Sequence, residues 1–148
     1  MLGELTADEI EKLLESELIG RIGCHADGRT YVVPVTYVYD GAAIIGHTGQ
    51  GLKVEMMREN PEVCFEVEDL RHLPRWSSVV IQGRYEELHG AAAASALDRL
   101  MARLQASPPG MSEMPWQGAG VFAPGTHAQR PEVMFRIAIL EKTGRYDR

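Results

Sequence analysis

The segment of the sequence best suited to bind an anion is a glycine-rich turn between a predicted strand and a predicted short helix. Gly46-His-Thr-Gly-Gln-Gly-Leu-Lys53 ends a strand, turns, and begins a helix with a lysine in its first turn. The first N–H groups of a helix lack partners and lie at the positive end of its dipole, and glycines allow an anion to approach closely. Thr48 adds a hydroxyl and Lys53 a positive charge, so the pattern predicts a phosphate site. A plain glycine-rich turn with a solvated lysine explains the spacing equally well.

A second candidate is the run Tyr31-Val-Val-Pro-Val-Thr-Tyr37, in which a proline interrupts a strong strand pattern. Proline cannot donate to a β-ladder, so this strand is predicted to lie at a sheet edge or to split there. Backbone groups around Val35 and Thr36 would then be available to a flat polar ligand. An ordinary edge strand is the alternative, and the residues alone favour it.

The third candidate is Arg75-Trp-Ser-Ser-Val79, at the start of another predicted strand. Two hydroxyl groups beside a tryptophan are suited to a pocket for a phosphate and a ring, although a strand start with capping serines explains them as well. His47 lies where the earlier strand meets the glycine-rich turn. It is predicted to bind a phosphate or face a bound ring, and as a group that titrates near neutral pH it is also a candidate proton donor.

The elements that position these residues follow from hydrophobic periodicity and turn signals. Six strands in hairpin-rich order favour a mainly β fold, an antiparallel β-barrel with peripheral helices. Thr6 and Glu9 form a predicted capping box at the start of the first helix. The helices are predicted at 6–18, 49–59 and 90–105, the strands at 18–24, 31–39, 42–48, 62–67, 77–88 and 133–140 (a barrel over about 18–88 and 132–141), and an aperiodic Pro/Gly-rich loop at 107–130.

Length and composition limit the class of protein. The 148 residues suggest one domain (1–148), and a net charge of −6 argues against a nucleic-acid partner. No apolar run is long enough to cross a membrane, and the acidic, helical N-terminus is unlike a signal peptide. No metal site is expected, because Cys24 and His25 are adjacent rather than spaced like ligands, and Cys64 is isolated. A cytoplasmic protein is expected.

In combination, the motifs resemble those of a known family. The strand Tyr31–Tyr39, His47-Thr-x-x-Gly-x-Lys53, Asn60-Pro-x-Val-Cys-Phe65 and Trp76-x-Ser-Val-x-x-x-Gly-Arg84 occur in the order found in the pyridoxamine 5′-phosphate oxidase-like FMN-binding split barrels. The ending Phe135-Arg-Ile-x-Ile139 with Thr143-Gly-Arg145 is similar to the subgroup that contains nitroimidazole-resistance proteins.

The resemblance implies a six-stranded antiparallel split barrel that forms a homodimer with FMN at the subunit interface. It implies an oxidoreductase that reduces a small planar acceptor of nitro-aromatic or quinone type, with NAD(P)H as a candidate electron donor. The implied cofactor-binding residues are the backbone of Val33, Pro34, Val35 and Thr36 along the flavin ring, His47, Thr48 and Lys53 at the phosphate and ribityl end, and Trp76, Ser77 and Ser78 from the same chain or its partner.

One departure from the family concerns the substrate. True pyridoxamine phosphate oxidases carry a C-terminal arginine–histidine pair, whereas no histidine follows His127 here. Oxidation of pyridoxamine phosphate is therefore not expected. Two alternatives stay open: a non-catalytic flavin-binding protein for storage or sensing, and the same barrel with haem or a deazaflavin coenzyme.

Overall fold

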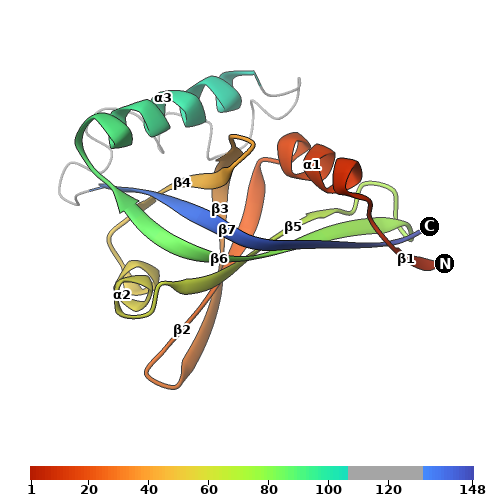
Figure 1. Cartoon of the computed structure of the whole chain (residues 1–148), viewed down its shortest axis with the longest axis horizontal. Coiled ribbons are helices and arrows are strands. Elements are labelled where there is room, and N and C mark those ends of the chain that lie inside the picture. The colour runs from red at the N-terminus through yellow and green to blue at the C-terminus, as the bar shows by residue number, and fades with distance from the viewer. Residues whose placement is uncertain (107–131) are drawn as a thin grey trace.

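The fold is a closed antiparallel β-barrel with three peripheral helices (Figure 1). The computed structural model describes residues 1–106 and 132–148. Six strands pair in the order β7-β4-β3-β2-β5-β6, and β6 pairs back onto β7 to close the barrel, while β1 is added outside β7. The elements are β1 (Leu2–Glu4), α1 (Ala7–Ser16), β2 (Ile19–Ala26), β3 (Arg29–Tyr39), β4 (Ala43–Gly49), α2 (Leu52–Glu59), β5 (Glu62–Asp69), β6 (Trp76–Leu88), α3 (Gly90–Gln105) and β7 (Glu132–Asp147).

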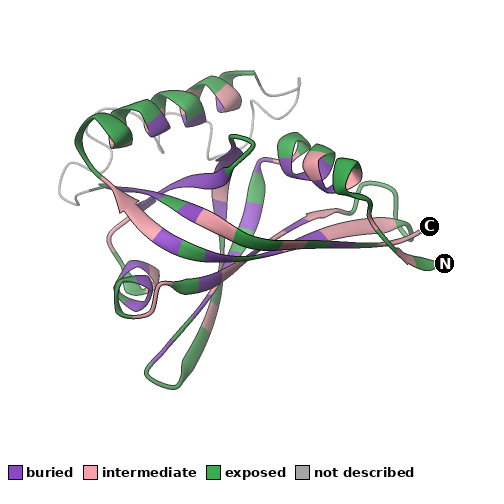
Figure 2. Cartoon of the chain, viewed as in Figure 1, coloured by how far each residue is buried: buried purple, intermediate pink, exposed green. Residues whose placement is uncertain are grey.

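The core fills the barrel because the strands alternate buried and less buried residues, as Figure 2 shows. Phe65 and Tyr37 pack edge to face with ring centroids 5.1 Å apart. The first helix, α1, adds its apolar side chains to this core, including the fully buried Leu14. Its predicted capping box is confirmed, since Thr6 and Glu9 exchange the two expected hydrogen bonds. Helix α1 thus covers one end of the barrel.

The helix α3 packs on the outside of the barrel, over β3, β4 and β7. Leu100 and Leu104 bury their side chains against Val38, Ile45 and Met134, in a second hydrophobic cluster separate from the barrel interior. Helix α2 lies beside β2 at the other end of the barrel from α1.

The strand that contains Pro34 has a free edge there, as its sequence predicts. Residues 29–36 of β3 pair only with β2, and pairing with β4 begins at Tyr37. The Tyr37 N–H donates to Leu18 O at 3.1 Å, so the backbone N–H and C=O groups of Tyr37 face β2. Because these groups alternate in direction along a strand, those of the even-numbered residues 30–36 face away from β2. The N–H that Pro34 lacks would point to this free edge, and the proline therefore costs no ladder hydrogen bond.

Most boundaries differ from the sequence-based expectation by one or two residues, and three differences bear on the site. The last strand extends to Asp147 rather than 140, because a register shift at Gln82/Gly83 lets it continue beside β6 and the unpredicted β1. The short helix begins at Leu52 rather than 49, because the chain remains non-helical through Gly51. Helix α1 ends at Ser16, where Glu17 adopts an extended conformation, rather than at 18. The predicted loop 107–130 lies outside the described residues.

Candidate functional site

The turn between β4 and α2 presents backbone donors without acceptors. Gly51 is the N-cap of α2 and has no side chain to cap it, and the first helical bond runs from Glu55 N–H to Gly51 O. No described side chain accepts from the N–H groups of residues 52–54. A Cβ added at Gly49 or Gly51 would meet no atom within 4 Å, so the space around this turn is open. An eight-residue helix with a bare N-terminus is suited to hold an anion.

Lys53 is a partly buried cation at this turn. No carboxylate lies within ion-pair distance of its ammonium among the described residues, whereas Lys142 pairs with Glu11. Burial lowers the pKa of Lys53, and the nearby Cys24 thiol offsets this only in part. Removing an ammonium from water without a counter-charge is unfavourable, so an anion at this position would restore the lost interaction.

The two polar residues at the end of β4 are occupied within the chain. His47 Nε2 lies 2.7 Å from Glu132 Oε2 at the start of β7, and the His47 side chain is only 5% exposed. The Thr48 hydroxyl donates to Gly49 O at 3.2 Å. His47 therefore ties β4 to β7, and its predicted binding or catalytic role stays a prediction.

The predicted ring-binding residues Val33 to Thr36 lie on the part of β3 that has a free edge. The carbonyl of Pro34 and the backbone groups of Thr36 face that edge by strand alternation. Val35 points into the core, while Pro34 is exposed. Backbone rather than side-chain groups are thus available here, as the sequence predicts for a flat polar ligand.

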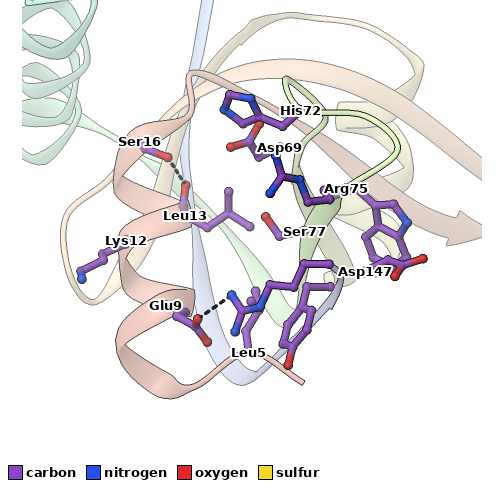
Figure 3. Close-up of a pocket in the computed structure, with 13 residues that line it drawn as sticks. Leu5, Glu9, Lys12, Leu13, Ser16, Asp69, His72, Arg75, Ser77 and Asp147 are labelled. Carbon is purple, nitrogen blue, oxygen red and sulfur yellow. Dashed lines mark hydrogen bonds and ion pairs between the residues drawn. The ribbon is translucent and has the colours of Figure 1, made fainter. Parts of the chain in front are cut away.

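Trp76, Ser77 and Ser78 lie at a different place on the barrel. Ser78 is on the outer face, where its hydroxyl donates to Glu66 Oε1 at 2.8 Å. Trp76 and Ser77 line a cavity of about 620 Å³ between α1, the β5–β6 connection and the end of β7 (Figure 3). The other lining residues are Leu5, Glu9, Lys12, Leu13, Ser16, Asp69, His72, Arg75, Tyr146, Asp147 and Arg148.

Within one chain, the predicted site residues form two separate groups. Thr48 pairs with Val133 at the beginning of β7, and Trp76 pairs with Asp147 at its end. Thirteen residues of β7 lie between Val133 and Asp147, a path along the strand of roughly 45 Å at about 3.3 Å per residue. We call the Thr48–Lys53 region the cradle end and the cavity beside α1 the α1 end.

Sequence reasoning missed most of the α1 end. The cavity requires α1 to pack beside the last residues of the chain, where the Arg148 guanidinium stacks over the Tyr146 ring at 3.8 Å from its centroid. The packing of α1 beside the last residues depends on the extension of β7. The polar residues after Leu140 show no strand pattern that would predict this extension. The only local signal was the Arg75–Ser78 run at the start of β6.

Metal binding and a reactive thiol are two alternative chemistries to consider among the described residues. No group of three or more His, Cys, Asp or Glu among them is placed to hold a metal ion. Burial raises the pKa of the Cys24 thiol, which disfavours the nucleophilic thiolate. None of the described helices combines the length and apolarity needed to cross a membrane.

Comparison with known proteins places the chain in a family. A crystal structure of an FAD-binding protein from Mesorhizobium loti is 33% identical, with a TM-score of 0.78 over 99% of this chain and 96% of that one. A protein of Bacteroides thetaiotaomicron named for 5-nitroimidazole antibiotic resistance is 20% identical, with a TM-score of 0.72 over 100% and 92% of the two chains, and bears on the fold alone. An uncharacterized protein of Rhizobium meliloti is 31% identical over 84 residues, 57% of this chain, and the match spans only 56% of that protein's length.

The resemblance inferred from the motifs is thus confirmed by similarity along almost the whole chain. The family model for pyridoxamine 5′-phosphate oxidase matches residues 6–145, which include all three helices, the cradle end and most of the barrel. The chain belongs to the pyridoxamine 5′-phosphate oxidase family.

Proposed function

We propose that this protein is an FMN-dependent oxidoreductase that reduces a small planar acceptor of nitro-aromatic or quinone type. The observation that carries the proposal is the cradle end, where a partly buried lysine, with no carboxylate partner in the described part of the chain, lies beside the bare N-terminus of α2. The FAD-binding relative from Mesorhizobium loti supports a flavin as the ligand. The terminal phosphate of a flavin would supply the negative charge that the Lys53 ammonium does not receive from a carboxylate.

Each group at the cradle has a defined task in this proposal. The Lys53 ammonium and the N–H groups of residues 52–54 hold the phosphate, and the Thr48 hydroxyl can turn from Gly49 O toward the same oxygens. His47 stays paired with Glu132 and fixes the end of β4 against β7. The free backbone groups of Pro34 and Thr36 orient the polar edge of the ring. The flavin, when bound, supplies the hydride chemistry that no side chain of the barrel provides.

The separation of the two ends supports a homodimer as the active form. Trp76 and Ser77 lie beside the opposite end of β7 from the cradle of their own chain, so we expect a second copy to supply these residues to a complete site. Apolar surface suited to such contact lies along the hairpin: Val32 is 59% and Ile19 42% exposed. Light scattering is expected to give the mass of a dimer, with FMN bound in a ratio of one per chain.

The absorbance spectrum of the purified protein tests the proposal directly. Flavin bands in the blue are expected, and mass spectrometry of the released ligand should give FMN rather than FAD. NADH or NADPH should bleach these bands, and a nitro-aromatic acceptor should restore them. A flavin that stays oxidised with both nucleotides and with acceptors would favour storage or sensing, whereas a Soret band would identify haem and overturn the proposal.

A further inference from the structure

The cavity at the α1 end is lined by apolar, aromatic and charged side chains, and one of its cations has no ion pair among the described residues. Its volume of about 620 Å³ lies within the range of small-molecule sites. Leu5, Leu13, Trp76 and Tyr146 supply apolar and aromatic surface. Such a lining is suited to one planar ring rather than to a long flexible chain.

The carboxylates around this cavity are already neutralised. Glu9 lies 3.0 Å from Arg148, Asp69 lies 2.7 Å from Arg71, and Asp147 lies 2.6 Å from the Met1 ammonium. These acids therefore have little remaining capacity to attract or repel a ligand's charge. The charge preference of the cavity then depends on the lining residues that have no ion pair.

Arg75 is an exposed lining cation that has no ion pair among the described residues. Figure 3 shows its guanidinium directed into the cavity above Ser77, while the Lys12 side chain points away from it. Neither the Arg75 side chain nor the Ser77 hydroxyl has a hydrogen-bond or ion-pair partner among the residues that the structure describes. A guanidinium and a hydroxyl at one wall match the oxygens of a carboxylate.

We propose that the α1-end cavity binds a planar aromatic acid, with its carboxylate on Arg75 and Ser77 and its ring against Trp76. This inference deepens the proposed function and rests on it in one respect: it names the charge of the acceptor. Trp76 and Ser77 are also residues that we assign to the flavin site, so the cavity would adjoin the ring at which the acceptor is reduced.

Calorimetric titration with 4-nitrobenzoate and with nitrobenzene, its neutral counterpart, tests the inference. The acid should bind the purified protein about tenfold more tightly than nitrobenzene, which corresponds to one charge-assisted hydrogen-bonding group. Arg75→Gln should remove this preference and leave nitrobenzene binding unchanged. Arg84→Gln is the matched control, because Arg84 is an exposed arginine of β6 outside the cavity.

Quenching of fluorescence locates the ligand. Trp76 and Trp116 are the two tryptophans, so Trp116→Phe leaves Trp76 as the only tryptophan, whose selectively excited fluorescence 4-nitrobenzoate should quench. The inference is overturned by equal affinity for the acid and nitrobenzene, by a preference that survives Arg75→Gln, or by binding without quenching. Loss of the preference in Arg84→Gln as well would also overturn it. Flavin content, measured by absorbance on the same samples, tests the proposed function separately.

Discussion

The C-terminus of α1 and the N-terminus of α2 treat their unpaired backbone groups in opposite ways. All four terminal carbonyls of α1 accept hydrogen bonds. The Ser16 hydroxyl donates to Leu13 O, and the Tyr37 hydroxyl donates to Leu14 O. The Arg103 guanidinium donates to Glu15 O and Ser16 O. The N-terminus of α2 has a glycine cap, no side-chain acceptor and a lysine without a carboxylate partner among the described residues.

Helix α1 is held in place by donors to its terminal carbonyls, whereas the N-terminus of α2 has free N–H groups that can bind a ligand. A saturated terminus gains nothing from a ligand, and α1 is held by groups from β3 and α3. An unsaturated terminus beside a partly buried ammonium gains several charge-assisted hydrogen bonds when an anion arrives. The α1 end therefore has a cavity wall that is fixed before a ligand binds, and the cradle end has free hydrogen-bond donors.

The largest effect is expected when the packing of α1 is removed. Leu14→Ala deletes a fully buried side chain and should lower the free energy of unfolding by about 2–5 kcal/mol in urea titrations. Hydrogen exchange should then increase more at the start of β6 than in α2. Leu100→Ala, which truncates an equally buried leucine of α3, is the control. Equal loss of protection at both ends in Leu14→Ala would contradict the comparison.

A smaller effect is expected from the hydrogen bond that saturates α1. Tyr37→Phe leaves Leu14 O without its donor at 2.7 Å and should lower the free energy of unfolding by about 1 kcal/mol. Tyr31→Phe on the same strand removes a hydroxyl for which the described residues provide no partner, and should change stability by less than about 0.5 kcal/mol. Thermal unfolding of both variants checks this, and similar losses would show that the Tyr37 contact is unimportant.

The smallest effect concerns the acid sensitivity of the α1 end. The hydrogen bonds from Arg71 lower the pKa of Asp69 to about 2, against about 4 in an unfolded chain. A lowered pKa stabilises the fold above about pH 4, and this stabilisation disappears as the pH falls toward 2. Asp69→Asn should therefore cost up to about 1 kcal/mol at pH 7, after allowance for solvent screening, and converge with the wild type near pH 2.

Urea midpoints at both pH values measure this difference. Asp98→Asn, on the exposed face of α3, is the control and should leave the pH dependence unchanged. A constant difference between Asp69→Asn and the wild type from pH 7 to pH 2 would be inconsistent with the assignment.

Local signals in the sequence predicted the elements well. The capping box at Thr6, the short connection between the predicted strands 31–39 and 42–48, and the edge position of Pro34 each depend on residues within a few positions of one another. The barrel followed from strands that alternate in burial and succeed one another through short turns. The strand β1 escaped prediction because three residues are too few to display a period.

The site could be predicted only where it is local. Thr48, Gly51 and Lys53 are close in the chain, so their spacing alone indicated a candidate anion site. The distance of Trp76 and Ser77 from that cradle arises from the length of β7, and the role of Arg75 depends on α1 packing beside Arg148. Contacts between the first and last elements of a chain leave no periodic signal in either segment.

The most direct test of the account compares FMN with riboflavin, which lacks the phosphate. Flavin-free wild-type protein should bind FMN about 10- to 100-fold more tightly than riboflavin, as expected for a phosphate held by a charged partner. Lys53→Ala should remove most of this difference and leave riboflavin affinity unchanged, while Lys12→Ala on α1 should behave as the wild type. Equal affinity of the wild-type protein for the two flavins, or a full preference for FMN in Lys53→Ala, would contradict a phosphate site at the cradle end.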